Sequence, residues 1–320
     1  MTTVTYLGPA GTFTEAALLA MARRGEIGPG GGEGAGSGGP GGDLETVPVD
    51  SPGAALAAVR KGDADFACVA IENSVDGPVT PTFDALTLGP ELQIYRETEI
   101  GVEFSILVRP GTDPASIRSF TTHPVAYPQV KQWVDANLPG VDFHSASSNA
   151  AAAHLVADGV HDACAAPARA GELLGLEAIA EGVADVRGAR TRFVLVGRPG
   201  VPTARTGVDR TSVSFTLRNE PGTLMRSMNE FAVRDVNLTR IESRPTRESM
   251  GAYRFHIDVA GHIDDPAVAS ALAALHRRAA DLRFLGSWPA AQGSASIDAG
   301  PPDVTDALDW VAELKEGKRR

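Results

Sequence analysis

The chain has 320 residues, 43% of them hydrophobic, and a formal net charge of -11 at pH 7. This length exceeds what one hydrophobic core usually organises, so we expect two or three domains. The acidic balance, with no basic face carrying aromatic residues, argues against a nucleic-acid partner, and no apolar run is long enough to cross a bilayer.

The first residues lead directly into a strand pattern without the features of a signal peptide, so we expect a cytoplasmic protein. Cys68 and Cys164 each lie in an apolar stretch, which fits small buried thiols in a reducing compartment. No set of residues along the sequence has metal-ligand spacing.

The first candidate site is a turn that joins a strand over 3–7 to a helix over 12–21. Backbone N–H groups at a helix start attract anions, so Gly11 and Thr12 are candidates for binding a carboxylate. The third glycine of a dinucleotide fingerprint is absent. A simple tight turn is the alternative interpretation.

Residues 28–42 are mostly glycine and predict a flexible insertion rather than a site. The near-continuous apolar run 65–71 then predicts a strand of a parallel sheet that is covered on both faces. Glu72, Asn73 and Ser74 follow it directly, where ligands bind in open α/β sheets. An Asx turn and a helix cap explain Asn73 and Ser74 equally well.

A second group of polar residues stands at two further strand-to-helix junctions. Thr122, His123 and Gln129 crowd the first junction, although a histidine before a proline is more often structural than catalytic. Ser147 and Ser148 are candidate caps of a helix that runs through Val156. Two α/β lobes with helix N-termini facing a cleft are therefore expected.

The stretch 185–197 ends this part of the chain with Thr191, Arg192 and Phe193 at the mouth of an apolar strand. A hydroxyl, a guanidinium and a ring presented side by side suit an anionic, hydroxylated small molecule. A strand entry with solvated arginines is the alternative. After a linker over 199–210, the elements from residue 211 follow the order βαββαβ of a ferredoxin-like domain.

Taken in order, these segments resemble prephenate dehydratase over nearly the whole chain. The resemblance rests on Gly8-Pro-Ala-Gly-Thr-Phe-Thr-Glu15, Ile71-Glu-Asn-Ser74, Thr122-His-Pro through Gln129, Ser147-Ser-Asn-Ala-Ala, and Thr191-Arg-Phe193. The later part resembles the family's ACT regulatory domain through Asn219-Glu-Pro-Gly-Thr-Leu224 and Ile241-Glu-Ser-Arg-Pro245.

The resemblance implies an α/β fold with a two-lobed, periplasmic-binding-protein-like catalytic domain over 1–198 and an ACT domain over 211–289. A tail with a short helix follows over 290–320. Members of the family convert prephenate to phenylpyruvate with loss of CO2 and the ring hydroxyl, and use no metal or organic cofactor.

The family resemblance also assigns roles to single residues. Thr191 would hydrogen-bond the leaving hydroxyl, and Phe193 would pack behind it. Arg192 would meet a substrate carboxylate or form a salt bridge within the protein. The residues expected to orient the substrate are Glu72, Asn73, Thr122 and Gln129, and the residues expected to bind its anionic groups are Gly11, Thr12, Ser74, Ser147 and Ser148.

Phenylalanine inhibits many members of the family through the ACT domain, and the resemblance implies a homo-oligomer, either a dimer or a tetramer, because an exposed sheet edge tends to pair. The phenylalanine site is expected at Pro221, Gly222, Thr223, Leu224, Leu238, Glu242, Ser243, Arg244 and Pro245. Two alternatives stay open. One is the same chemistry on arogenate, and the other is a non-catalytic amino-acid sensor, against which the joint presence of Thr191, Glu72 and Gln129 argues.

Overall fold

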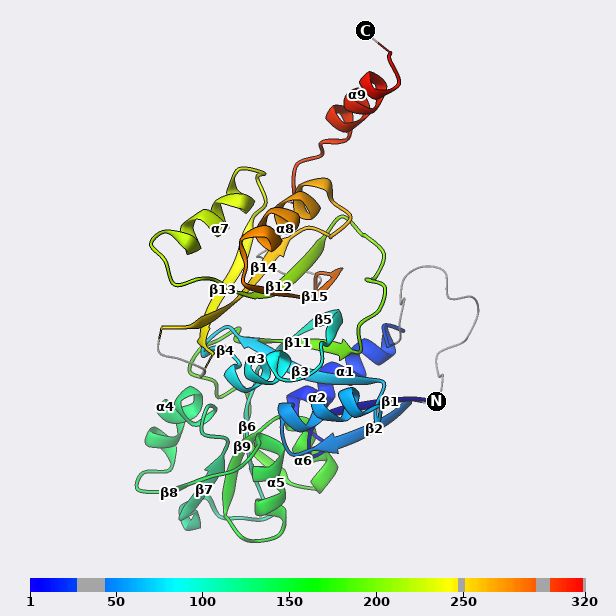
Figure 1. The fold of residues 1–320 in the computed structure, drawn as a ribbon. Coiled ribbons are helices and arrows are strands. Elements are labelled where there is room, and N and C mark those ends of the chain that lie inside the picture. Colours follow the sequence, from blue (N-terminus) through cyan, green and yellow to red (C-terminus); the bar gives the residue numbers. More distant parts are fainter. Residues whose placement is uncertain (28–43, 247–250, 292–299, 319–320) are drawn as a thin grey trace. The chain divides into compact units, whose positions relative to one another are not determined.

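The structure is a computed structural model that describes residues 1–27, 44–246, 251–291 and 300–318 (Figure 1). The predicted glycine-rich insertion at 28–42 therefore lies outside the described residues. The chain divides into two compact units. The first comprises Met1–Leu92 and Glu97–Pro199, and the second comprises Gln93–Arg96 and Gly200–Arg320.

The first lobe of the first unit is built on one mixed sheet with the strand order β2-β1-β3-β11-β5. The strands β2 and β3 both pair parallel to β1, whereas β11 returns from the second lobe and pairs antiparallel to β3. A short strand, β4, also pairs with β3. The strands are β1 (Thr2–Leu7), β2 (Leu44–Val49), β3 (Phe66–Asn73), β4 (Gly77–Pro78), β5 (Gln93–Gly101, of which the residues from Glu97 belong to this unit) and β11 (Arg190–Gly197).

Local sequence explains where the helices of this lobe begin. The helix α1 (Phe13–Arg23) is capped by Thr12, whose hydroxyl accepts the N–H of Glu15, and α2 (Pro52–Lys61) is capped in the same way by Ser51. A left-handed Gly62 ends α2. With α3 (Thr80–Thr87), these helices bury Leu18, Met21, Leu56, Val59, Phe83 and Leu86.

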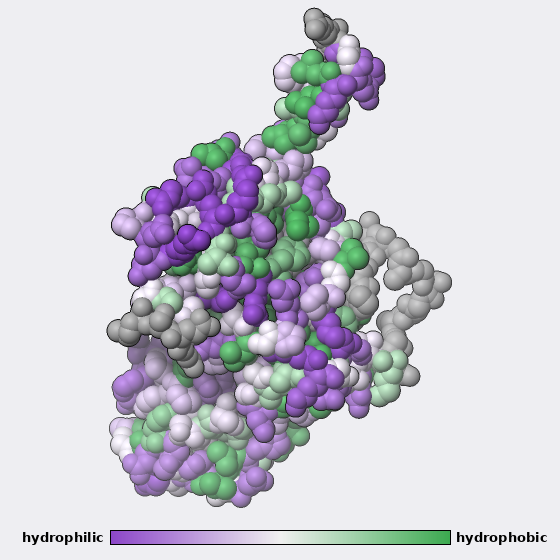
Figure 2. Space-filling view, viewed as in Figure 1, coloured by the Kyte–Doolittle hydropathy of each residue, from purple (hydrophilic) through white to green (hydrophobic). Residues whose placement is uncertain are grey.

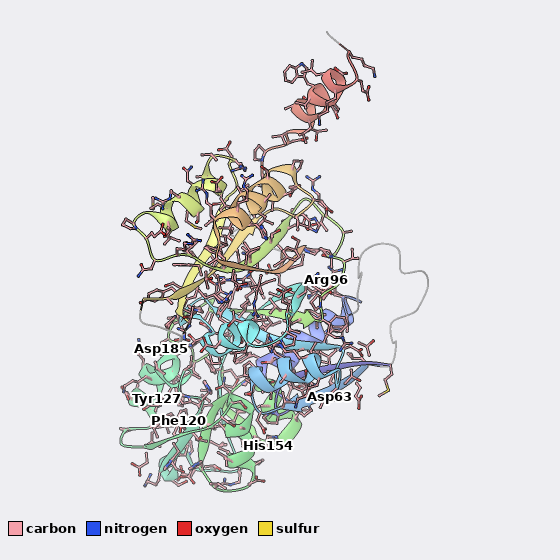
Figure 3. All side chains as sticks on the ribbon, in the orientation of Figure 1. Asp63, Arg96, Phe120, Tyr127, His154 and Asp185 are labelled. Atoms are coloured by element: carbon pink, nitrogen blue, oxygen red, sulfur yellow. The ribbon has the colours of Figure 1, made fainter. Side chains whose placement is uncertain are left out.

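The second lobe contains a sheet with the order β10-β6-β9-β7-β8. Phe120 and Tyr127 lie together in this lobe (Figure 3), with ring centroids 6.2 Å apart, and Tyr127 stacks on Phe143 at 4.0 Å. These rings anchor the start of α4 against the sheet. The elements are β6 (Ser105–Val108), β7 (Ser119–Thr122), β8 (Asp142–Ser145), β9 (Ala163–Ala166), β10 (Glu177–Ala180), the 3-10 helix Pro114–Ser116, α4 (Tyr127–Asn137), α5 (Asn149–Ala157) and α6 (Ala168–Leu174).

The second unit has the predicted βαββαβ order and a sheet with the order β13-β14-β12-β15. Its core combines the sheet with both helices and includes Val213, Phe215, Phe231, Ile257 and Leu275. The elements are β12 (Asp209–Thr216), α7 (Thr223–Ala232), β13 (Leu238–Pro245), β14 (Tyr253–Ala260), α8 (Pro266–Arg278) and β15 (Asp281–Pro289). The sequence-based prediction of the fold class is confirmed in both units.

The predicted short helix of the tail forms as α9 (Thr305–Lys315). None of its residues is buried, and hydrophobic and hydrophilic side chains are both visible on its surface (Figure 2). The exposed apolar residues are Leu308, Trp310, Val311 and Leu314. Among the helices in the described ranges, none combines the length and apolar character that a membrane span requires.

Candidate active site

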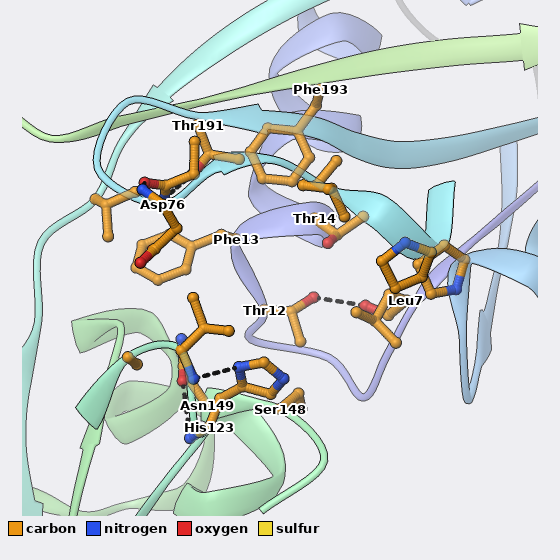
Figure 4. Close-up of a pocket in the computed structure, with 18 of the residues that line it drawn as sticks. Leu7, Thr12, Phe13, Thr14, Asp76, His123, Ser148, Asn149, Thr191 and Phe193 are labelled. Atoms are coloured by element: carbon orange, nitrogen blue, oxygen red, sulfur yellow. Dashed lines mark hydrogen bonds between the residues drawn. The ribbon is translucent and has the colours of Figure 1, made fainter. Parts of the chain in front are cut away.

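A pocket of about 510 Å³ lies in the first unit and is lined by residues of both lobes (Figure 4). Its walls are largely apolar and include Phe13, Val102, Phe104, Val125 and Phe193. Polar side chains are set into these walls at a few points. A largely apolar cavity with a small number of converging polar groups is typical of a site for a small molecule.

Thr191 presents its hydroxyl to this pocket and is held there by Asn73. The two residues face each other across β11 and β3, and the Asn73 Nδ2 donates to Thr191 Oγ1 at 2.9 Å. Since the oxygen accepts this bond, the hydroxyl hydrogen can be donated to a bound molecule. The Asn73 Oδ1 accepts the N–H groups of Val75 and Asp76, so the residue forms the predicted Asx turn and also lines the pocket.

Arg192 lies on the other face of β11, because successive side chains of a strand point to opposite sides. Its guanidinium donates to Glu97 at 3.1 Å and to Glu72 at 2.8 Å, and its side chain is 5% exposed. The Glu97 side chain is fully buried. The structure thus shows the salt bridge within the protein that the sequence left open, and Glu72, predicted to orient substrate, is placed in this ion pair and not in the described pocket lining.

The turn at Gly11 and Thr12, predicted to bind a substrate carboxylate, already binds a carboxylate of the protein itself. The Glu15 carboxylate accepts the Gly11 N–H at 2.8 Å, and Thr12 accepts the Glu15 N–H at 3.1 Å. This reciprocal arrangement is a variant of the capping box. The Gly11 N–H is therefore already bonded to a carboxylate that pairs with Arg169 at 3.4 Å, and it is not open to a substrate carboxylate, although the Thr12 side chain does line the pocket.

Two further predicted residues also have structural partners. The Thr122 hydroxyl is fully buried and donates to the Ala165 carbonyl at 2.7 Å. Ser74 is exposed, and its hydroxyl accepts the Arg190 N–H at 2.9 Å. The described lining of the pocket includes neither residue. Thr122 donates its hydroxyl hydrogen to a backbone carbonyl, whereas Ser74 is set apart by its exposed position outside the lining and not by the bond that it accepts.

The second lobe contributes Gln129, Ser147 and Ser148 to the pocket, as the sequence predicted. Ser148 caps α5 by accepting the Ala151 N–H at 3.0 Å. Asn149 stands beside it in the lining and accepts the His123 N–H at 3.2 Å. Thr122 also donates to Asn149, at 3.1 Å, so it positions this neighbour from outside the pocket.

Sequence patterns assigned no site role to Asp76 and favoured a structural role for His123, and both residues line the pocket. The Gln129 Nε2 donates to Asp76 Oδ2 at 2.5 Å. Burial raises the pKa of Asp76, and the Gln129 hydrogen bond and the nearby His123 oppose that rise. Burial lowers the pKa of His123, partly offset by Asp76. The Asp-Gly pair at 76–77 is typical of a turn, so the sequence pattern indicated a loop residue and not a carboxylate of the pocket.

The remaining groups with possible chemistry are the two cysteines and the possible metal-binding side chains. Cys68 and Cys164 are both buried and free, and burial raises the pKa of each thiol. Within the part of the chain that the structure describes, no cluster of three or more His, Cys, Asp or Glu side chains could hold a metal ion.

Two family profiles match the chain. That of prephenate dehydratase matches residues 4–200, and that of the ACT domain matches residues 211–277. This chain belongs to the prephenate dehydratase family. The prephenate dehydratase of Mycolicibacterium gilvum is 54% identical over 315 residues, which cover 98% of this chain and 99% of that protein.

Solved structures give the same result. The prephenate dehydratase from Arthrobacter aurescens in complex with L-Phe has a TM-score of 0.81 and 41% identity, and the match covers 98% of this chain and 99% of that one. GqqA, described as a novel type of quorum quenching acylase, has a TM-score of 0.74 and 30% identity, with 91% and 98% covered. A protein with a similar structure is therefore described with a different activity.

The residues predicted to bind phenylalanine fall on two consecutive elements of the ACT domain. Pro221, Gly222, Thr223 and Leu224 form the start of α7, where Gly222 adopts a left-handed conformation with φ of 76°. The others lie on β13, the terminal strand of its sheet among the described residues. Ile241, in the middle of this strand, is 50% exposed. The strand residues are Leu238, Glu242, Ser243, Arg244 and Pro245.

Proposed function

We propose that this protein is a cytoplasmic prephenate dehydratase, which converts prephenate to phenylpyruvate, CO2 and water in phenylalanine biosynthesis. The observation that carries the proposal is the Thr191 hydroxyl, held by Asn73 at the wall of an apolar pocket in a member of this family. Gln129, Ser147 and Ser148 are proposed to contact the substrate with them, and Thr12 and Phe193 to complete the lining.

The chemistry requires the ring hydroxyl to leave while the ring carboxylate departs as CO2. A hydrogen bond from Thr191 to the hydroxyl oxygen stabilises the negative charge that grows there, and help of this kind is typically worth about 10²–10⁴ in rate. The two electrons of the broken carbon–carbon bond enter the ring, so no separate electron acceptor is needed. Formation of the aromatic ring drives the reaction.

The apolar walls contribute in a second way. The charge of the departing carboxylate becomes dispersed over the ring in the transition state, and a poorly solvating pocket penalises the localised charge of the bound substrate more than that transition state. Phe13, Phe104 and Phe193 supply aromatic surface for the substrate ring. We therefore assign the ring to this part of the pocket.

We also propose that phenylalanine binds the ACT domain and inhibits the enzyme. The support is the matched ACT profile and the phenylalanine complex of the Arthrobacter relative. An inhibitor of this kind needs a difference in affinity between two states of typically about 1–3 kcal/mol. The terminal strand β13 and its exposed Ile241 support a homo-oligomer, a dimer or a tetramer, that forms through this domain.

Arogenate is the second candidate substrate, and one observation favours it. It carries an ammonium group where prephenate has a keto group, and the pocket lining contains two carboxylates, Asp50 and Asp76, that could pair with an ammonium. Discrimination between the two substrates would then depend on whether either carboxylate contacts the group by which they differ.

The test measures phenylpyruvate formation from prephenate, and phenylalanine formation from arogenate, by the purified protein with and without phenylalanine. Conversion of prephenate that phenylalanine suppresses is the expected result. Conversion of arogenate alone would replace the substrate assignment, and failure on both would favour the non-catalytic sensor.

The regulatory site is tested with Gly222→Val, since a β-branched residue is strained at a positive φ. Suppression by phenylalanine should be lost while basal turnover is kept. Gly317→Val, at an exposed position of similar φ in the tail, is the matched control. Inhibition that survives Gly222→Val unchanged would contradict the assignment of α7.

A further inference from the structure

The leaving hydroxyl needs a proton, and Thr191 cannot be its lasting source. An alkoxide left on a threonine would be far more basic than the carboxylates and imidazole that surround it. Among the described residues of the pocket lining, the titratable side chains are Asp50, Asp76 and His123. This inference rests on the proposed dehydratase reaction and asks which of the three delivers the proton.

His123 is poorly suited to this role. Burial lowers the pKa of its imidazole, so the ring is neutral near pH 7. Its Nδ1 accepts the Val125 N–H at 3.3 Å, which assigns the proton to Nε2. A neutral imidazole is a weak acid, so His123 fits hydrogen bonding to the substrate better than proton donation.

Asp50 lies at the opposite end of the pocket from Thr191. It follows β2 directly, and the last pair of residues between β1 and β2 joins Leu7 to Val49. Figure 4 shows Leu7 well separated from Thr191, whereas Asp76 lies beside Thr191. Position therefore selects Asp76 from the two carboxylates.

The structure also fixes Asp76 to the same amide that holds the catalytic hydroxyl. Asn73 accepts the Asp76 N–H at 3.1 Å through Oδ1 and donates to Thr191 through Nδ2. Gln129, from α4 of the other lobe, donates to the Asp76 carboxyl group. One asparagine thus connects the Asp76 backbone to the Thr191 hydroxyl, and one glutamine holds the Asp76 carboxyl group.

We propose that the Asp76 carboxylic acid is the general acid that protonates the leaving hydroxyl, with Thr191 donating a hydrogen bond to the same oxygen. The proton passes from Asp76 to this oxygen as the carbon–oxygen bond breaks, and water leaves. The electron pair of the bond to the ring carboxylate enters the ring, and CO2 leaves. Asp76 is then a carboxylate, and it regains its proton from solvent.

Two further properties of the site fit this cycle. Burial raises the pKa of Asp76, which increases the fraction that carries a proton near neutrality, while Gln129 and His123 oppose the rise and keep the carboxylate accessible after transfer. The residue is also solvent-exposed, so water can return the proton. The raised pKa places the active form below that pKa, so turnover should decline as the pH increases through it.

The experiment compares Asp76→Asn, Asp76→Glu and wild type on prephenate across the pH range. Asp76→Asn should lower kcat by about 10²–10⁴ with a much smaller change in KM, and Asp76→Glu should recover most of the loss because it restores a proton donor. The alkaline decline of kcat should be present in the wild type and absent in Asp76→Asn. Asp135→Asn removes an exposed carboxylate from α4 and should behave as wild type.

The possible contrary outcomes have distinct meanings. A wild type that converts prephenate together with an Asp76→Asn variant of normal kcat would overturn the role of Asp76 and leave the dehydratase assignment intact. A loss confined to KM would make Asp76 a binding residue and overturn the proton transfer. A wild type inactive on prephenate would remove both proposals.

Discussion

The two faces of β11 differ in what their polar side chains contact, although the residues are adjacent in one motif. On one face, Thr191 and Phe193 line a pocket, and Thr191 accepts a hydrogen bond from Asn73 that leaves its own hydroxyl hydrogen for a ligand. On the other face, Arg192 is enclosed by the carboxylates of Glu72 and Glu97. Groups that serve a ligand keep bonding capacity toward a cavity, whereas groups that serve the fold are satisfied by the protein.

The ACT domain contains a second enclosed polar cluster that makes the same point. Asp258 is buried and accepts two hydrogen bonds from Arg240, at 2.9 and 2.7 Å. His256 lies on the same strand and is 1% exposed. We therefore expect substitutions at the pocket to change turnover, and substitutions in the enclosed clusters to change stability.

The largest effect is expected for Thr191→Val, which keeps the shape of the side chain and removes the hydroxyl. kcat on prephenate should fall by about 10²–10⁴, because the leaving oxygen loses its hydrogen-bond donor. Thr191→Ser should keep most of the rate. Thermal unfolding of both variants should resemble that of the wild type, and near-normal kcat for Thr191→Val would contradict the role given to the hydroxyl.

The next effect is a loss of stability when the buried ion pair of Arg192 and Glu97 is broken. Glu97→Leu leaves the Arg192 charge with one partner fewer in a buried position, and the free energy of unfolding should fall by about 3–5 kcal/mol. Denaturant unfolding measures it. Glu99→Leu is the matched control, since Glu99 pairs across the same two strands with the half-exposed Arg190, and a pair of this kind is worth about 0–1 kcal/mol. Equal losses for both variants would show that enclosure does not distinguish them.

The smallest effect, about 2 kcal/mol between pH 4.5 and 6, is a pH dependence of the ACT domain. Burial, assisted by the charges of Arg240 and Arg254, lowers the pKa of His256 to about 3. The unfolded chain therefore binds one more proton than the folded chain between that pKa and the ordinary value of 6.5. Stability is fully present above the unfolded pKa and is lost as the pH falls, by up to about 1.4 kcal/mol per pH unit.

His256→Gln should flatten this dependence between about pH 4.5 and 6, as measured by denaturant unfolding at each pH. The control is His276→Gln, because His276 is exposed on α8. An unchanged slope for His256→Gln would mean that other groups dominate the acid sensitivity.

Secondary structure, the lobes and the ferredoxin-like order followed from the sequence because they depend on local patterns. An apolar strand at 65–71, threonine and serine caps before α1 and α2, and the βαββαβ order from residue 211 are each visible without tertiary contacts. The sequence also placed Asn73, Gln129, Ser148, Thr191 and Phe193 at strand ends and helix starts, and the pocket lining contains all five.

Tertiary structure decided which polar groups remain available to a ligand. Thr122 looked equivalent to Thr191 as a hydroxyl beside a strand, yet it donates its hydrogen to the backbone carbonyl of Ala165, more than 40 residues away in sequence, and no local pattern reveals such a partner. Glu72 likewise has a partner that is distant in sequence, because it forms an ion pair with Arg192 on strand β11. Asp76 gained its place in the pocket only when Gln129 was brought across from the other lobe. Residue type and spacing determine what chemistry is possible, whereas long-range packing determines which groups are left to perform it.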